Sequence, residues 1–133
     1  MPIKSTREMV AAANAELEVI PAEAAIEMLG TEGVTFVDIR DVRERWRDGA
    51  IPGAWHVPRG MLEFWIDPTS PYAKEEFQSG NKFVLYCAGG MRSALATKIA
   101  QDMGLTPVAH IETGFGGWKK AGGPVEEIKP KER

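Results

Sequence analysis

The residues best suited to chemistry in this chain are Cys87 and the residues that follow it. Cys87 is the only cysteine, and it comes directly after the apolar run 83–86, which is typical of a buried parallel strand. Gly89, Gly90 and Arg92 follow. The glycines allow backbone conformations that turn several amide groups toward one centre, and Arg92 adds a cation. This combination indicates a nucleophilic thiol that faces an anionic substrate.

A helix is expected directly after this loop. Leu95, Ile99 and Met103 recur at intervals of four, and Gly104 marks the end of the pattern. The first amide groups of a helix have no partner within it and its dipole is positive there, so the thiolate of Cys87 is favoured. An inert buried thiol is the simpler interpretation of a lone cysteine. The glycines, the arginine and the helix together favour the reactive site.

The rest of the chain alternates between strand and helix patterns. Strands are expected at 18–20, 34–39, 54–57, 83–86 and 108–112. Two helix starts have capping-box spacing, Ser5 with Glu8 and Asp41 with Glu44. This alternation predicts an α/β fold with a mainly parallel sheet covered on both faces. Ligands of such sheets bind beyond the carboxyl ends of the strands, where Cys87 lies.

Composition narrows the function classes. The chain has 133 residues, 44% of them hydrophobic and 26% charged, with a net charge of −3, which suits one globular domain and gives no basic surface for nucleic acid. No apolar run is long enough for a membrane span or a signal peptide, and the single thiol suits a reducing compartment, so we expect a cytoplasmic protein. One cysteine and the separated His56 and His110 form no metal-ligand spacing, so we expect no metal and no cofactor.

Three segments of the chain resemble the signatures of the rhodanese-like sulfurtransferases. The first is Asp38-Ile39-Arg40, Glu44 and the run 49–58, the second is Cys87-Ala88-Gly89-Gly90-Met91-Arg92-Ser93, and the third is the run 114–118 with 121–125. Ala50 stands where the family usually has histidine, and the segment from Glu44 to Gly49 is one residue longer than usual. The resemblance covers about residues 18 to 126.

This resemblance implies a three-layer α/β/α fold with a five-stranded parallel sheet. Residues 18–126 would form the rhodanese-like domain, residues 1–17 an added N-terminal helix, and residues 127–133 a polar tail. Cys87 would carry a sulfane sulfur as a persulfide. The amides from Ala88 through Gly89, Gly90 and Met91 to Arg92 would form the substrate cradle, and the Arg92 side chain would bind the anion.

The function expected from this resemblance is that of a thiosulfate sulfurtransferase. Cys87 would take a sulfane sulfur from thiosulfate or a similar small anionic donor and pass it to cyanide or a thiol. Two alternatives remain open: a non-enzymatic module that carries a persulfide or senses redox state while bound to a partner protein, and cysteine-dependent phosphatase or arsenate reductase chemistry. No nucleic-acid or membrane partner is expected, and a homodimer is one candidate assembly.

Other prominent residues are expected to be structural. Asp38 and Arg40 are expected to bond to each other or to nearby backbone, and His56 and His110 to have no catalytic role. Trp46, Trp55 and Trp118 are expected to be packing residues. Met61, Leu62, Phe64 and Trp65, called the 61–65 cluster below, are expected to form either a pocket wall or an interface.

Overall fold

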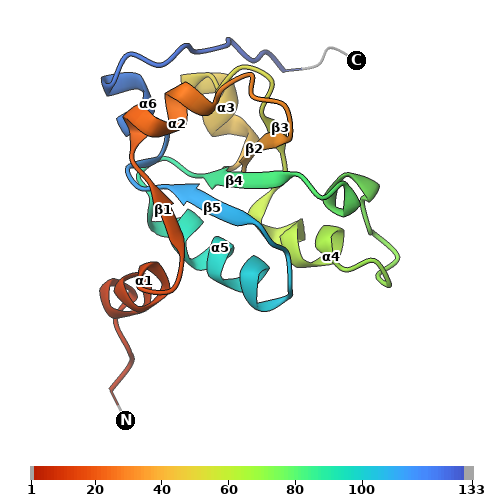
Figure 1. The fold of residues 1–133 in the computed structure, drawn as a ribbon. Coiled ribbons are helices and arrows are strands. Elements are labelled where there is room, and N and C mark those ends of the chain that lie inside the picture. Colours follow the sequence, from red (N-terminus) through yellow and green to blue (C-terminus); the bar gives the residue numbers. More distant parts are fainter. Residues whose placement is uncertain (1, 131–133) are drawn as a thin grey trace.

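The structure is a computed structural model that describes residues 2–130. Its centre is a five-stranded parallel sheet with the order β1-β5-β4-β2-β3 (Figure 1). The strands are β1 (Glu18–Ile20), β2 (Val34–Asp38), β3 (Trp55–His56), β4 (Lys82–Tyr86) and β5 (Val108–Ile111). All five lie within a residue or two of the positions expected from sequence, so the predicted parallel sheet is confirmed.

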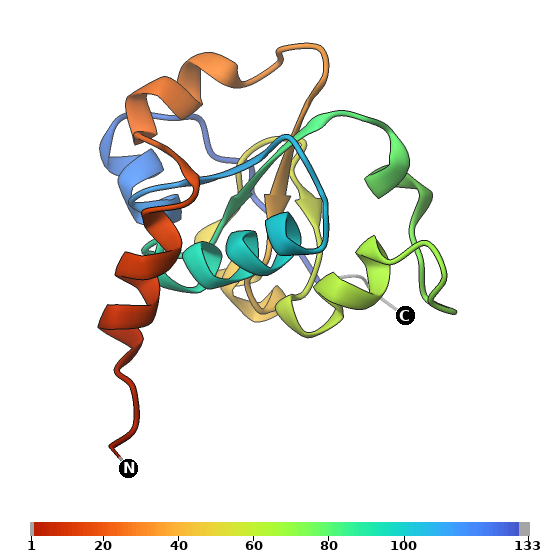
Figure 2. The same ribbon diagram turned by 60° about the horizontal axis from the view of Figure 1, so that its bottom comes forward.

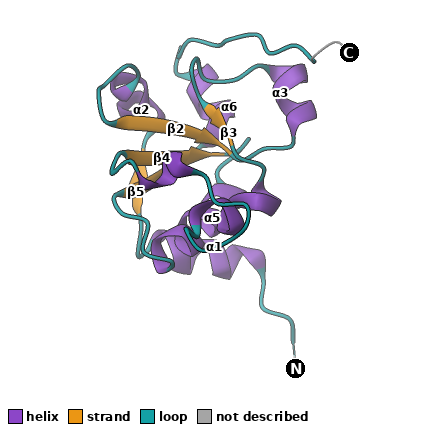
Figure 3. Cartoon of the chain, turned by 90° about the vertical axis from the view of Figure 1, so that its right-hand side faces the viewer, coloured by secondary structure: helices purple, strands orange, loops and turns teal. Residues whose placement is uncertain are grey.

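Helices cover both faces of this sheet (Figures 1 and 3). One face carries α2 (Ala22–Met28), α3 (Val42–Asp48) and α6 (Gly114–Lys120). The other carries α1 (Thr6–Asn14), α4 (Leu62–Ile66) and α5 (Met91–Asp102). Two 3-10 helices, η1 (Arg59–Met61) and η2 (Glu75–Gln78), lie in the connection between β3 and β4. The three-layer α/β/α architecture expected from sequence is therefore present.

The central strand β4 divides the core into two apolar layers. Phe83, Leu85 and Cys87 pack into the layer beneath α4 and α5, while Val84 and Tyr86 pack into the layer beneath α2 and α6. This alternation follows from the period of two in an extended strand. It places the sulfur of Cys87 on the α5 side of the sheet, at the end of the strand.

Helix α5 turns its small side chains toward the sheet. Ser93, Ala94, Ala96, Thr97 and Ala100 are buried. Ile99 and Met103, from the stripe that predicted this helix, are 37% and 41% exposed. The small residues let the helix approach β4 and β5 closely. Ile99 lines a pocket together with residues of α1, whereas Met103 lines another pocket together with Ile66 and Phe77.

Helix α1 lies beside α5, as two views show (Figures 1 and 2). Its first turn is capped as expected, because the Ser5 hydroxyl accepts the amide hydrogen of Glu8. Beyond its end, the Gln101 side chain of α5 donates to the carbonyl oxygen of Glu16 at 3.0 Å. The N-terminal helix is thus packed onto the helix that begins at the cysteine loop.

Candidate active site

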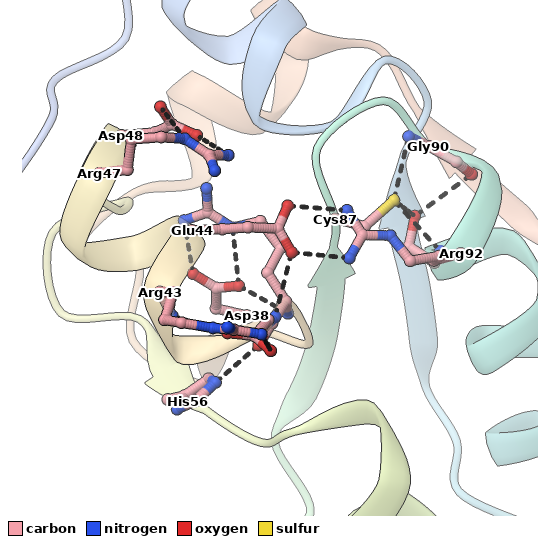
Figure 4. Close-up of polar contacts among 12 residues, drawn as sticks. Asp38, Arg43, Glu44, Arg47, Asp48, His56, Cys87, Gly90 and Arg92 are labelled. Carbon is pink, nitrogen blue, oxygen red and sulfur yellow. Dashed lines mark hydrogen bonds and ion pairs between the residues drawn. The ribbon is translucent and has the colours of Figure 1, made fainter.

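The Cys87 sulfur is held by backbone amides at the start of α5. The amide groups of Gly90 and Ser93 donate to Sγ at 3.1 and 3.3 Å, and Figure 4 shows the sulfur turned toward the beginning of this helix. Gly90 caps the helix with φ 106°, a left-handed conformation that favours glycine. Two donors and the positive helix end are the surroundings that favour a thiolate.

A second glycine, Gly114 at the start of α6, allows this helix to pack directly against the cysteine loop. The amides of Phe115 and Gly116 donate to the carbonyl oxygens of Cys87 and Ala88 at 2.8 and 2.9 Å. A Cβ atom on Gly114 would lie 2.6 Å from the Cys87 carbonyl oxygen. The start of α6 therefore approaches the cysteine loop too closely for any side chain, which explains the glycine at this position.

A pocket of about 410 Å³ opens over the sulfur. Its lining residues are Thr6, Val10, Cys87, Gly89, Met91, Arg92 and Leu95. Of the five cradle residues expected from sequence, three line this pocket: Gly89, Met91 and Arg92. The carbonyl of Ala88 instead accepts from α6, and the amide of Gly90 donates to the sulfur. Thr6 and Val10 were not expected here, because nothing in their types or spacing indicates a site. They make α1 one wall of the pocket.

The Arg92 side chain is already engaged in an ion pair. Its Nη1 and Nη2 donate to the two carboxylate oxygens of Glu44 at 2.9 and 3.0 Å (Figure 4). The hydrogen bonds from Arg92 lower the pKa of Glu44, and those to Glu44 raise the pKa of Arg92. The guanidinium that was expected to bind the substrate anion thus has a bidentate carboxylate partner from α3.

Behind the pocket, a buried charged network fixes the end of β2. Both Asp38 carboxylate oxygens accept from Arg40, at 3.0 and 2.8 Å, and Oδ2 also accepts from Arg45 and from the Tyr86 hydroxyl. Burial alone would raise the pKa of Asp38, but the hydrogen bonds and charge of Arg40 outweigh it and leave the pKa low. Arg40 also donates to the Gly49 carbonyl at 2.7 Å. The pairing of Asp38 with Arg40 expected from sequence is present in the structure.

The two histidines lie in different surroundings. His56 Nε2 lies 2.8 Å from the Arg40 carbonyl oxygen. His110 is buried on β5, with Nδ1 2.9 Å from the Ser93 hydroxyl and Nε2 2.7 Å from the Asn14 side-chain oxygen. The Ser93 hydroxyl is also the contact of the Cys87 sulfur, at 3.6 Å. His110 is therefore linked to the site through Ser93, a connection that no sequence spacing indicated.

The 61–65 cluster lies away from this pocket. Leu62 is buried in the core, Trp65 stacks on Trp55 with ring centroids 5.9 Å apart, and Phe64 is 51% exposed beside Tyr72. None of the four cluster residues lines the pocket at Cys87. The 61–65 cluster therefore does not form a wall of the cysteine pocket, which was one of the two roles expected for it.

Two further classes of site were searched for within residues 2–130. No group of three or more histidine, cysteine or acidic side chains there is placed to hold a metal ion. In the same described part of the chain, no helix is long and apolar enough to cross a membrane.

Known proteins similar in sequence to this chain include sulfur-transfer proteins. Thiosulfate sulfurtransferase GlpE of Actinobacillus succinogenes is 27% identical over 84% of this chain and 95% of its own length. YrkF of Bacillus subtilis, to which a sulfur-carrier function is attributed, is 24% identical over 65% of this chain and 42% of its own length. A solved structure from Rhodopseudomonas palustris, of unknown function and described as a possible tyrosine phosphatase, is 57% identical with a TM-score of 0.90 and covers 95% of this chain and 99% of its own.

A family model covers most of the chain. The rhodanese-like domain matches residues 21–121, which include the cysteine loop, the buried network around Asp38 and the supporting turn at Gly114. Helix α1 lies outside the matched range. On the match and the five-stranded parallel sheet together, the chain belongs to the rhodanese-like domain family.

Proposed function

We propose that this protein is a sulfurtransferase that works through a persulfide on Cys87. The observation that carries the proposal is the position of Sγ, which accepts two backbone amides and faces a pocket at the carboxyl end of β4. A thiolate held in this way is a nucleophile with its charge already stabilised, so it needs no separate base. The sulfurtransferase relatives support this chemistry at the level of the family.

The reaction has two half-steps. The Cys87 thiolate attacks the outer sulfur of thiosulfate or a similar donor, a new sulfur–sulfur bond forms, and sulfite leaves with the electron pair of the broken bond. Cyanide or a thiolate acceptor then attacks the outer sulfur of the persulfide, and Cys87 leaves again as the thiolate. The amides of Gly90 and Ser93 stabilise the negative charge on the Cys87 sulfur before the first half-step, and again as the thiolate leaves in the second.

Mass spectrometry of the intact protein tests the first half-step. After incubation with thiosulfate, the protein should gain the mass of one sulfur atom, and cyanide should remove it. Because the chain has one cysteine, the Cys87→Ser variant is a matched control that should keep its fold and gain no sulfur. Sulfur uptake by this variant, or none by the parent protein with any sulfane donor, would overturn the assignment.

A persulfide carrier without turnover is the second candidate, and the relationship to YrkF favours it. A redox-sensing module that acts through Cys87 belongs to the same class. A carrier would take up one sulfur atom per chain and hold it until it meets a partner protein. A sensor would be oxidised once per chain at Cys87. Steady-state formation of thiocyanate from thiosulfate and cyanide separates the two, since only the enzyme continues beyond one equivalent.

A further inference from the structure

A buried chain of polar side chains connects the Cys87 sulfur to the N-terminal helix. Sγ of Cys87 lies 3.6 Å from Oγ of Ser93, Oγ lies 2.9 Å from Nδ1 of His110, and Nε2 of His110 lies 2.7 Å from Oδ1 of Asn14. Ser93 and His110 are completely buried. The links join the first turn of α5 and the third residue of β5 to the last residue of α1, a helix outside the matched family domain.

The direction of these hydrogen bonds follows from the Asn14 end. Oδ1 of Asn14 can only accept, so Nε2 of His110 carries the hydrogen and Nδ1 is free to accept from the Ser93 hydroxyl. Burial lowers the pKa of His110 to about 4, which keeps the ring neutral near pH 7. The Ser93 hydroxyl thus gives its hydrogen to His110 and turns its oxygen toward the sulfur.

This direction acts on the charge of Cys87. An oxygen that presents lone pairs can accept the hydrogen of a thiol, but it offers nothing to a thiolate. If the hydroxyl turned to the sulfur instead, Nδ1 of His110 would be left buried without a donor, which is unfavourable. The amides of Gly90 and Ser93 favour the thiolate, and the chain through the Ser93 hydroxyl opposes it. Among the described residues that line the pocket, Arg92 is the charged one, and it pairs with Glu44 of α3.

We propose that His110 and Asn14 are positioning residues of the active site, which hold the Ser93 hydroxyl toward His110 and so limit the fraction of Cys87 present as thiolate. Helix α1 is then part of the site in two ways. It supplies the wall formed by Thr6 and Val10, and its last residue fixes the hydrogen-bond direction that reaches the nucleophile. The proposal rests on Cys87 as the nucleophile of the proposed function, but it concerns the ionisation of that thiol and not the transfer of sulfur.

Two substitutions of His110 test the contact at Nδ1 and the contact at Nε2 separately. In His110→Asn, the shorter amide places its oxygen near the position of Nδ1 and can still accept from Ser93. In His110→Gln, the longer amide reaches toward Asn14 and removes the acceptor at 2.9 Å from the Ser93 hydroxyl. The hydroxyl is then left with the Gly90 carbonyl at 3.4 Å and the Cys87 sulfur at 3.6 Å. The proposal predicts that the ratio of thiolate to thiol rises about three- to tenfold in His110→Gln, the range expected for one hydrogen bond. In His110→Asn the ratio should stay near that of the parent protein.

The thiolate is measured by its ultraviolet absorbance at fixed neutral pH, with Cys87→Ser as the blank. Since this chain has a single cysteine, the signal has one source. The rate of alkylation by iodoacetamide is recorded in parallel. A pocket that is merely loosened would raise the alkylation rate without raising the absorbance, and that result would overturn the proposal. Equal absorbance changes in the Asn and Gln variants would overturn it as well.

Matched controls isolate the chain of contacts. In a Ser93→Ala background, exchanging His110 for Gln should no longer change the thiolate fraction, because the connecting hydroxyl is absent. Thr97→Val is the control for Ser93→Ala: Thr97 is buried one turn further along α5, and its hydroxyl has no hydrogen-bond partner among the described residues. Gln101→Ala is the control for Asn14→Ala, since it removes a different contact between α5 and the N-terminal segment.

For this set, Asn14→Ala should raise the thiolate fraction while Gln101→Ala and Thr97→Val leave it unchanged. Equal effects of Asn14→Ala and Gln101→Ala would show general loosening and contradict the proposal. Uptake of one sulfur from thiosulfate is scored separately by mass. If the variants show the expected thiolate fractions but the protein takes up no sulfur, the proposed function alone is refuted. If the protein takes up sulfur but the thiolate fractions do not change as expected, this inference alone is refuted.

Discussion

Arg92 and Glu44 form a bidentate ion pair that joins the start of α5 to the first turn of α3. The two bonds measure 2.9 and 3.0 Å, and the pair spans 48 residues of sequence. Glu44 is 18% and Arg92 45% exposed in their side chains. The cation at the pocket rim is thus neutralised by a carboxylate. An anionic donor in the proposed reaction would have to compete with Glu44 for it.

Loss of Arg92 should reduce the use of anionic donors more than the use of neutral acceptors. A charge-assisted contact contributes about 1.5–3 kcal/mol, so Arg92→Ala should lower kcat/KM for thiosulfate accordingly. Glu44→Gln, which keeps a residue able to cap α3, should free Arg92 and lower KM for thiosulfate. Steady-state kinetics with thiosulfate and with several acceptors checks both. Equal losses for both substrate types, or a higher KM in Glu44→Gln, would show that the pair is structural.

We expect no Cys87-dependent hydrolysis of phosphate esters. Four residues separate Cys87 from Arg92, one fewer than in the loops of the related cysteine phosphatases, and a shorter loop closes to a ring too small for a phosphoryl group in line with the sulfur. Tyr86, where those enzymes usually have histidine, donates its hydroxyl hydrogen to Asp38, and burial raises its pKa. No aspartic acid within residues 2–130 lines the pocket to protonate a leaving group.

The measurement is release of nitrophenol from p-nitrophenyl phosphate by the parent protein and by Cys87→Ser. Indistinguishable rates are the expected result. A clear excess in the parent protein would favour phosphatase chemistry and would agree with the description of the Rhodopseudomonas palustris relative.

Protonation of His110 should make stability depend on pH. Burial lowers its pKa from 6.5 to about 4 in the folded protein, so between these values the unfolded chain binds more protons than the folded one. The free energy of unfolding should therefore fall as the pH is lowered through this window, by about 3 kcal/mol at most. Above pH 6.5 the ring is neutral in both states and contributes no pH dependence.

Urea unfolding followed by tryptophan fluorescence measures this effect. The carboxylates also titrate at low pH, so the quantity of interest is the difference between the parent protein and His110→Asn, whose side chain does not titrate. The two stability curves should converge toward pH 4. Parallel curves would contradict the burial of a neutral His110.

Gly114 should tolerate no side chain. Its φ is +62°, and a Cβ atom would lie 2.6 Å from the Cys87 carbonyl oxygen and 2.7 Å from the Ala88 carbonyl group. Gly114→Ala should lower the free energy of unfolding by about 1–3 kcal/mol and displace the cysteine loop, with loss of sulfur uptake. Gly122→Ala is the matched control, because Gly122 also has positive φ, +88°, but nothing lies within 4 Å of the added Cβ. Equal effects at both positions would show that backbone strain alone is responsible.

Much of the fold and the centre of the site could be predicted from sequence because their signals are local. The apolar run before Cys87 determines β4, and the spacing of Asp41 and Glu44 determines the capping box that begins α3. Gly90 lies where the backbone needs φ 106°. Each of these depends on interactions within a few residues, which a sequence pattern records directly.

The sequence by itself determined that a cysteine at a strand end faces a glycine loop and a helix; the tertiary structure decided what else touches that cysteine. Arg92 meets Glu44 because α3 and the start of α5 converge at the same edge of the sheet. His110 reaches Ser93 because β5 lies beside β4 and beneath α5, and Asn14 reaches His110 because α1 packs on α5. Such contacts arise where layers pack across long stretches of sequence, so no local spacing indicates them.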